Sequence, residues 1–297
     1  MTTTRLASGS EELEASYRLR HAVFTIGQGV PPEIERDDAD DSALHVVAVD
    51  GDELLGTGRL VDAGEHARLG RIAVADSAQG RGIGRLVVSE LEQQASRLGL
   101  SVVRLHAQEQ VVGFYERLGY ATQGAPDVEA GIRHRWMSKE LIPGLRPVAD
   151  ADSEGVIALI GGIWSAYPGV VLDVDREEPW MRAPGSEYAG RGGSFWVVGA
   201  EPVACVGVRP TSSGEVELKS LYVRPDQRRA RLATRLVWLV ERSARTSGAS
   251  RIGLWSDSRF VEAHAFYERL GYRETDQRRE LHDQSDTTEL EFEKLLG

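Results

Sequence analysis

The seven residues FYERLGY occur twice in this 297-residue chain, at 114–120 and again at 266–272. A chance repeat of seven identical residues is negligible, so an internal duplication is the first hypothesis. The flanking sequence supports it, because RIAVADSAQGRGIG (71–84) aligns with SLYVRPDQRRARLA (220–233) at a separation of 149 positions. The separation is 152 at the heptamer, which assigns three extra residues to a loop of the second copy. We therefore predict two homologous halves.

The predicted boundary lies where a strand-like run ends at Pro143 and Gly144 and a helix-start pattern begins. It gives two domains, 1–143 and 144–297, each of a size that can bury its own core. The single cysteine, Cys205, lies in the apolar run PVACVGV and is predicted to be buried and inert. One cysteine cannot form a disulfide framework.

The charge balance bears on the partners of the chain. There are 35 basic and 46 acidic residues, a net charge of −11, which disfavours nucleic acid and favours a cationic ligand. The first residues lack the apolar centre of a signal peptide, and no run is long enough to cross a membrane. We therefore expect a soluble, cytoplasmic protein without a membrane partner, either a monomer or a homodimer.

Hydrophobic periodicity gives the elements of the first half. Ser10 is the expected N-cap of a helix over GSEELEASYRLRHAVF, and PPEIERDDADD is expected to be a loop. Asp50-Gly51-Asp52 is a hairpin turn between ALHVVAVD and ELLGTGRLV. A strand (ARLGRIAV) precedes a helix (GRLVVSELEQQASRLG) with the apolar stripe Leu86, Val87, Leu91, Ala95 and Leu98, which Gly99 ends.

A strand (SVVRLHA), a helix carrying the heptamer and a hairpin around 119–140 complete the half. The predicted fold class is α/β, in the sense of an α+β mixed sheet. Each domain would have a mostly antiparallel sheet flanked by helices, and the chain would contain two such domains.

The stretch VADSAQGRGIG places Gly80, Gly82 and Gly84 where a strand enters a helix. Glycine permits positive φ and close approach of a ligand, and the first N–H groups of a helix attract anions. Such a turn can hold a phosphate, or can simply redirect the chain. It fits neither the dinucleotide fingerprint nor a P-loop.

The segment Gln79–Gly84 fits the pattern [QR]-x-x-G-x-[GA], and FYERLGY follows about thirty residues later. This pairing resembles the GNAT superfamily of acyl-CoA-dependent N-acyltransferases, and the resemblance extends through both halves. The first half also looks like a subgroup of small acetyltransferases with four short signatures. They are Gly56/Arg59, GRIAV (70–74), HAQ (106–108) and Gly131/His134.

The resemblance implies direct transfer of an acetyl group from acetyl-CoA to a primary amine of a small acceptor, within a ternary complex and without a metal. Tyr115 would protonate the departing thiolate; the alternative is a tyrosine that only fills the core. A backbone N–H of 72–74 would stabilise the oxyanion. The implied cofactor-binding residues are Ile72, Ala73, Val74, Gln79, Gly80, Arg81, Gly82, Ile83, Gly84, Arg85 and Gln108.

The general base is less well indicated. Many relatives carry a carboxylate on the central strand, where the second half has Glu217 and the first has Arg68. Candidates in the first half are Glu35, Asp37, His45, His106 and His134, with His106 favoured by its position at the end of a strand beside the cofactor. The acidic loop 33–41 either lines a cationic acceptor site or is a solvated charge run.

The second half departs from the pattern in its loop. Arg229, Arg231 and Ala233 replace Gly80, Gly82 and Gly84, and Phe260 replaces Gln108. Arg231 is expected to crowd the pyrophosphate site or to force different backbone dihedrals. Because Tyr267 and Glu217 remain, two alternatives stay beside a catalytic first half. In one the second half is catalytic and the first supports it; in the other the chain is a non-catalytic acyl-CoA sensor or scaffold.

Overall fold

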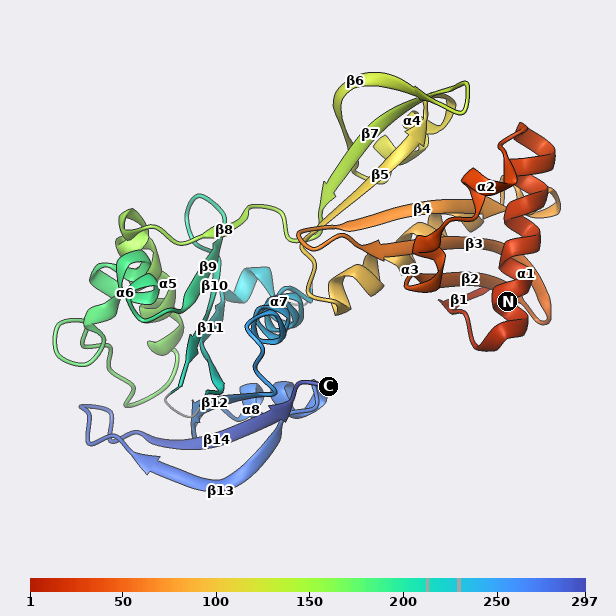
Figure 1. The fold of residues 1–297 in the computed structure, drawn as a ribbon. Coiled ribbons are helices and arrows are strands. Elements are labelled where there is room, and N and C mark those ends of the chain that lie inside the picture. Colours follow the sequence, from red (N-terminus) through yellow and green to blue (C-terminus); the bar gives the residue numbers. More distant parts are fainter. Residues whose placement is uncertain (212–213, 229–230) are drawn as a thin grey trace. The chain divides into compact units, whose positions relative to one another are not determined.

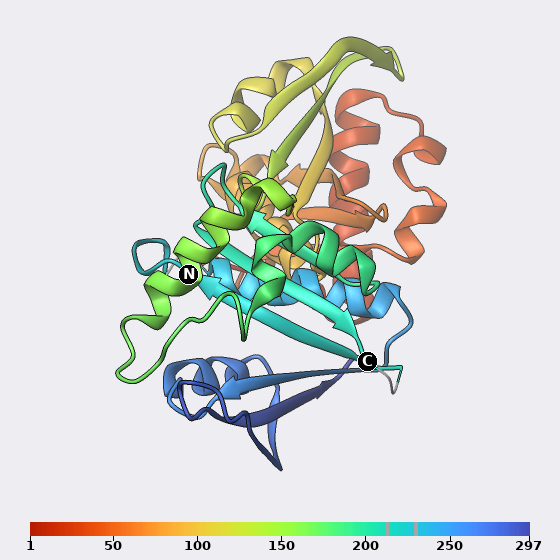
Figure 2. The same ribbon diagram turned by 90° about the vertical axis from the view of Figure 1, so that its left-hand side faces the viewer.

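The computed structural model describes residues 1–211, 214–228 and 231–297. The chain divides into two compact units, Met1–Leu141 and Ile142–Gly297, and the structure describes a seven-stranded sheet in each (Figures 1 and 2). The boundary separates two cores, because Leu141 packs into the first and Ile142 into the second. Among the described residues, no helix is long and apolar enough to cross a membrane.

The first unit has the strand order β1-β2-β3-β4-β5-β7-β6. Neighbouring strands are antiparallel except for β4 and β5, which are parallel. The elements are β1 (Thr3–Leu6), α1 (Gly9–Arg20), a π-helical turn (His21–Ile26), α2 (Pro32–Glu35), β2 (Leu44–Asp50), β3 (Glu53–Asp62), β4 (Ala67–Val74), α3 (Ile83–Arg97), β5 (Val102–Gln108), α4 (Val112–Glu116), β6 (Ala121–Glu129) and β7 (Ile132–Glu140). The predicted mixed α/β class is confirmed.

Local signals placed most of these elements correctly. The hairpin turn joins β2 to β3, with Asp50 opposite Glu53 and Gly51 at φ 61°. Helix α3 ends as predicted, because Gly99 has φ 75° and donates its N–H to the Ser96 carbonyl at 2.9 Å. A residue without Cβ is needed there to enter the left-handed region cheaply.

Three local expectations were wrong. Helix α1 begins at Gly9 with Ser8 as its N-cap, because the Glu12 carboxylate accepts the Ser8 N–H at 2.7 Å. The acidic segment is not a plain loop, since it forms α2 and a 3-10 turn at Asp38–Asp41. Leu86 does not belong to the buried stripe of α3, because it is 39% exposed.

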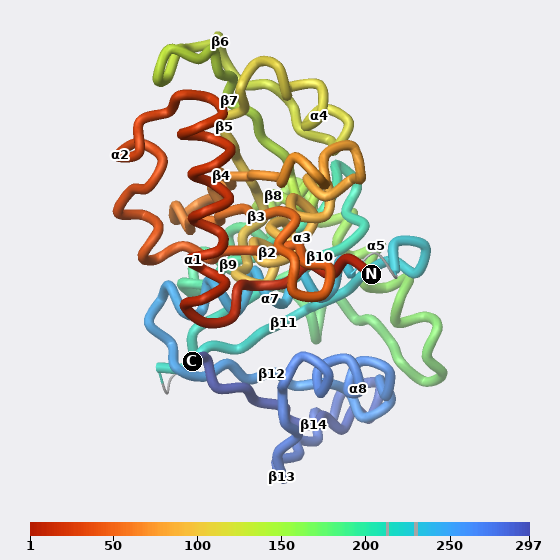
Figure 3. Tube along the Cα trace, turned by 90° about the vertical axis from the view of Figure 1, so that its right-hand side faces the viewer, coloured from red at the N-terminus to blue at the C-terminus, as the bar shows by residue number. Residues whose placement is uncertain are grey.

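Helices cover both faces of the first sheet. On one face α3 lies directly against β3, since a Cβ added at Gly58 would come within 2.7 Å of Val87 and 2.8 Å of Leu91. The opposite face of the same strands is covered by α1, which crosses them in Figure 3. Gly58 of β3 therefore sets the distance between α3 and the sheet.

Strands β4 and β5 separate along their length. Their parallel pairing covers only Ala67–Leu69 against Val103–Leu105, and beyond it the strands diverge (Figure 1). Just past this point β4 has a bulge, in which Arg71 takes φ 51° and two residues face Gly58 of β3. Such a bulge leaves a residue outside the ladder and turns the strand. The sheet therefore opens between β4 and β5.

The second unit repeats this topology, with the strand order β13-β14-β12-β11-β10-β9-β8 and β11 parallel to β12. A bulge recurs in β11, where Ser220 has φ 53°. Cys205 is buried as predicted, and burial raises its thiol pKa to about 12. The elements are β8 (Leu145–Pro147), α5 (Ser153–Trp164), α6 (Pro184–Gly190), β9 (Ser194–Val198), β10 (Ala204–Pro210), β11 (Val216–Val223), α7 (Leu232–Thr246), β12 (Arg251–Asp257), α8 (Val261–Arg269), β13 (Arg273–Glu280) and β14 (Thr288–Leu295).

The repeated heptamer has a structural task in both units. In the first, its last residue, Tyr120, donates its hydroxyl hydrogen to Glu92 of α3 at 2.9 Å, and Lys139 of β7 donates to the same carboxylate at 2.8 Å. In the second unit Lys294 donates to Glu241 at 2.8 Å. Tyr272 is buried beside that carboxylate. The heptamer thus connects the last helix to the preceding one and to the sheet.

Candidate active site

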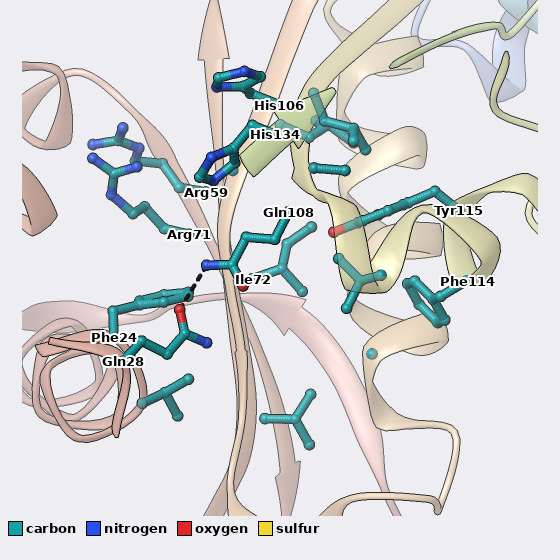
Figure 4. A pocket seen from close by; sticks show the side chains of 18 of the residues that line it. Phe24, Gln28, Arg59, Arg71, Ile72, His106, Gln108, Phe114, Tyr115 and His134 are labelled. Atoms are coloured by element: carbon teal, nitrogen blue, oxygen red, sulfur yellow. Dashed lines mark hydrogen bonds between the residues drawn. The ribbon is translucent and has the colours of Figure 1, made fainter. Parts of the chain in front are cut away.

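A cavity of about 780 Å³ opens in the first unit where β4 and β5 separate (Figure 4). Its walls come from the loop before α3, from β4 and β5, from α4, and from segments around residues 23–39 and 129–134. Most of the cofactor-binding residues predicted from the sequence line it. They are Ile72, Val74, Gln79, Gly80, Gly82, Ile83, Gly84, Arg85 and Gln108. Ala73 and Arg81 do not line this cavity.

The loop before α3 presents backbone to the cavity. Gly80 and Gly82 have φ 74° and 81°, and Gly82 caps α3 without a side-chain hydrogen bond. A Cβ at either glycine would meet nothing within 4 Å, so the backbone is open on this side. The first N–H groups of a helix have no intrahelical acceptor and carry the positive end of its dipole. This loop can therefore receive an anionic group.

Tyr115 lies on α4 with its hydroxyl directed across the cavity toward Ile72 and Gln108 (Figure 4). It is 8% exposed and packs edge-on against Phe114 and Tyr120. Burial raises its pKa to about 12, so the phenol keeps its proton at neutral pH. Tyr115 can therefore donate a hydrogen bond or a proton into the cavity, and it also contributes to the core.

Gln108 faces the cavity from the end of β5. Its amide donates to the Gln28 side chain at 2.6 Å, and Gln110 donates to its oxygen at 2.9 Å. Gln28 and Phe24 follow α1 and line the same cavity. Sequence reasoning missed both, because no local pattern connects a residue to a partner 80 positions away.

Glu35 is held in a buried ion pair. The Arg20 Nε donates to its Oε1 at 2.5 Å, and the two side chains are 1% and 6% exposed. Arg20 also donates to both oxygens of Asp40, at 2.6 and 3.0 Å. These contacts hold the pKa of Asp40 well below its usual range despite its burial. Glu35 is thus engaged with a guanidinium group, although it lines the cavity.

Asp37 pairs with two further arginines on the cavity wall. Arg59 donates to both of its oxygens, at 2.6 and 3.0 Å, and Arg71 donates to it at 3.1 Å. The Arg59 guanidinium also lies 2.9 Å from Asp40. Three carboxylates of the acidic segment are therefore matched by three guanidinium groups. The acidic segment is therefore not simply a run of solvated charges. Its ion pairs with the arginines offset the negative charge that would attract a cationic acceptor.

The three candidate histidines differ in what their rings contact. His45 is buried, and its Nε2 lies 3.1 Å from the Asp40 carbonyl oxygen. His106 is held between carboxylates, with Nδ1 at 2.9 Å from Glu129 and Nε2 at 2.7 Å from Asp127. His134 lines the cavity, and its Nδ1 donates to the Ile132 carbonyl at 2.9 Å.

The second unit has its own cavity, of about 540 Å³, at the corresponding opening between β11 and β12. Glu217 and Tyr267 line it, as does Phe260, the counterpart of Gln108. The Lys219 ammonium lies 3.3 Å from Glu217. Burial raises the pKa of Tyr267.

The loop of this unit corrects one expectation. Arg231 caps α7 at φ 57° and ψ 19°, close to the φ 81° and ψ 6° of Gly82. The arginine has therefore not forced different dihedrals, and any obstruction must come from its side chain. Arg229, the counterpart of Gly80, lies outside the described residues. Ala233, the counterpart of Gly84, packs against the core of this unit.

Comparison with known proteins identifies both units. Residues 13–141 match the family described as "Acetyltransferase (GNAT) domain", and residues 162–272 match the "Acetyltransferase (GNAT) family". The uncharacterized N-acetyltransferase YjcF of Bacillus subtilis (strain 168) is 34% identical over 136 residues, which cover 46% of this chain and 97% of that protein. Protein ElaA of Escherichia coli (strain K12) is 30% identical over 136 residues, covering 44% of this chain and 89% of that protein.

Among solved structures, an acyl-CoA N-acyltransferase from Pseudomonas aeruginosa matches with 28% identity and a TM-score of 0.43, covering 47% of this chain and 98% of that one. The two curated relatives thus have about the length of one unit. Acyltransferases of this fold generally use acetyl-CoA. The chain belongs to the GNAT family of N-acetyltransferases and contains two domains of that family in one polypeptide.

Proposed function

We propose that the chain transfers an acetyl group from acetyl-CoA to a primary amine of a small-molecule acceptor, and that the first unit is the catalytic one. The observation that carries the proposal is the 780 Å³ cavity, which brings the glycine loop, the β4 bulge and Tyr115 together. The second unit has a smaller cavity and an arginine where the first has Gly82. This asymmetry supports the assignment of catalysis to the first unit.

Each part of the cavity has a proposed task. The N–H groups of the loop and of the first turn of α3 bind the pyrophosphate of coenzyme A. The amine nitrogen attacks the thioester carbonyl, whose oxygen takes up negative charge beside a backbone N–H of 72–74. Collapse of this intermediate forms the amide, breaks the C–S bond and leaves a thiolate. Tyr115 donates its hydroxyl proton to that thiolate, and the phenolate regains a proton from solvent as coenzyme A leaves.

The attacking amine must lose a proton to a base. Among the candidates, Glu35 is paired with Arg20, His45 is buried against Asp40, and both ring nitrogens of His106 contact carboxylates. His134 donates through Nδ1, which leaves its Nε2 as an acceptor. We therefore assign the base to His134 in place of His106.

The proposal is tested by turnover. The purified chain is mixed with acetyl-CoA and a panel of amines, such as polyamines, aminoglycosides, amino acids and short peptides, and free thiol is measured. The acetylated product is identified by mass spectrometry. Turnover of a small amine that is lost in Tyr115→Phe and kept in Tyr267→Phe supports the proposal. Acetyl-CoA binding without turnover across the panel favours a non-catalytic sensor instead.

One observation favours a second candidate, in which the second unit is catalytic. Glu217 and Tyr267 line the same 540 Å³ cavity, so a carboxylate and a phenol are both present there. In that case Glu217→Gln would abolish turnover, while His134→Gln in the first unit would leave it intact.

A further inference from the structure

Four side chains with metal-binding groups meet on one face of the strands that border the cavity. His106 stands on β5, Asp127 and Glu129 on β6, and His134 on β7. The strand register explains why they meet, because Gln108 of β5 and Asp127 of β6 both lie opposite His134. His106 and Glu129 are each two residues from these positions, and side chains two apart on a strand share a face. One donor atom each from His106, Glu129 and His134 lie within 4.8 Å of one another.

We propose that His106, Glu129 and His134 bind a divalent transition-metal ion, with zinc the best match to the ligand types. Two imidazoles and a carboxylate suit zinc, which takes nitrogen and oxygen ligands in a tetrahedral arrangement. The fourth position would be open toward the cavity that all three residues line. This proposal departs from the expectation that the chain uses no metal.

The hydrogen bonds around both imidazoles support the proposal. A ligating histidine usually donates its other ring N–H to a carboxylate or a carbonyl, which fixes its tautomer. His134 donates Nδ1–H to the Ile132 carbonyl at 2.9 Å, so its Nε2 carries the lone pair. The Asp127 carboxylate lies 2.7 Å from His106 Nε2, so Nδ1 is the nitrogen of His106 that would bind the ion. That Nδ1 lies 2.9 Å from the Glu129 carboxylate. Each imidazole therefore has a partner at the nitrogen that would not bind the ion.

The His106 ring is held in place, and the other ligands must adjust to it. The His106 ring stacks between His134 and Trp136, with both centroids at 4.6 Å. Ligand atoms around a tetrahedral zinc ion with bonds of about 2.0–2.2 Å lie roughly 3.3 Å apart. The separations of up to 4.8 Å must therefore shorten by an ångström or more. Glu129 already lies 2.9 Å from His106 Nδ1, so the change falls mainly on His134. Its ring, which is stacked on His106 at 29°, must turn to bring Nε2 to the ion.

Metal binding is measured without reference to catalysis. The chain is freed of metal with a chelator, and Zn²⁺ is titrated in competition with a chromophoric indicator. We expect one ion per chain with micromolar or tighter affinity. Co²⁺ in place of Zn²⁺ should give the intense visible absorption of a tetrahedral site. His134→Gln and Glu129→Gln should each weaken binding at least tenfold, and Asp127→Asn should weaken it by about 10- to 100-fold through His106.

His21→Ala is the matched control, since His21 is an exposed histidine of the same unit outside the cluster. It should bind zinc like the unaltered chain. Circular dichroism establishes that each variant is folded. The proposal is overturned if the folded chain takes up no zinc at micromolar concentration. It is equally overturned if His134→Gln and Glu129→Gln bind as tightly as the His21→Ala control. Zinc on His134 Nε2 would occupy the lone pair that the proposed base uses. Turnover is therefore measured on the metal-free chain, so that the two proposals fail separately.

Discussion

The hydroxyl of Tyr120 donates a hydrogen bond to the carboxylate of Glu92 at 2.9 Å, which connects the end of the heptamer to helix α3. In the counterpart pair, burial and the nearby Glu241 carboxylate raise the pKa of Tyr272, but its hydroxyl makes no hydrogen bond of ordinary geometry among the described residues. A buried hydroxyl bonded to a charged group contributes more stability than an unpaired one. The two identical heptamers should therefore differ in what their last tyrosine contributes.

We predict that Tyr120→Phe lowers the free energy of unfolding by about 1–3 kcal/mol, because a hydrogen bond to a carboxylate is lost. Tyr272→Phe should have a smaller effect, because its hydroxyl makes no hydrogen bond of ordinary geometry among the described residues. Urea unfolding followed by circular dichroism measures both. Equal losses would show that the second pair forms the same hydrogen bond in solution.

Tyr115→Phe should lower kcat by about 10²-fold, the lower end of what general acids contribute, since a thiolate leaves readily. Acetyl-CoA affinity should change little, because the interaction develops only as the C–S bond breaks. Steady-state kinetics and calorimetry separate the two effects. Tyr267→Phe is the matched control, and an equal loss of kcat in that variant would mean that both units are catalytic.

Gly82→Arg should weaken acetyl-CoA binding at least tenfold without unfolding the chain. The position has φ 81°, which costs a non-glycine residue about 1–2 kcal/mol, and the new side chain would occupy the loop where the pyrophosphate binds. Calorimetry of the unaltered chain should give one site. Arg231→Gly is the reciprocal variant, and a second site of equal affinity in the unaltered chain would contradict the predicted asymmetry.

Asp40→Asn should destabilise the chain by about 3–5 kcal/mol, the usual result of removing one partner from a buried ion pair. Arg20 and Asp40 are 0% and 3% exposed, so water cannot replace the lost carboxylate. Asp50→Asn serves as the control, since Asp50 forms its ion pair with the N-terminal amine at the surface. Similar urea midpoints for the two variants would show that the buried network does not stabilise the fold.

The free energy of unfolding should fall as the pH drops below about 6.5, the ordinary pKa of a histidine side chain. Burial lowers the pKa of His45, which faces Asp40, Arg20, Arg59 and the Tyr17 ring. The unfolded chain therefore binds the proton first, so this contribution is complete above pH 6.5 and lost below it. Urea unfolding at pH 8 and pH 5.5 should show a smaller decrease for His45→Gln than for the unaltered chain; identical decreases would remove His45 as the cause.

The elements that the sequence predicted well depend on local signals. The turn at Gly51 and the end of α3 at Gly99 each follow from one residue and its neighbours. Local chemistry was sufficient for these two features, because backbone conformation there depends on residue type. The grouping of the loop glycines with Tyr115 follows from the resemblance to the GNAT superfamily, and all of them line one cavity.

The features that the sequence did not predict depend on contacts between distant segments. Arg20 reaches Glu35 and Asp40, which are 15 and 20 positions away, and Gln28 reaches Gln108. The acidic segment has the same composition whether its carboxylates face water or guanidinium groups. Only the tertiary fold decides between these environments, and here it places three arginines beside them.

The bulge shared by the two units bears on the history of the chain. Arg71 and Ser220 stand 149 positions apart, and both hold positive φ although neither is glycine. An extra strand residue at the same place in both halves indicates that their common ancestor already had it. Arg231, by contrast, keeps the backbone of Gly82 with a different side chain, so the two halves diverged there after they separated. Strand geometry thus came first, and the divergence of the loops followed.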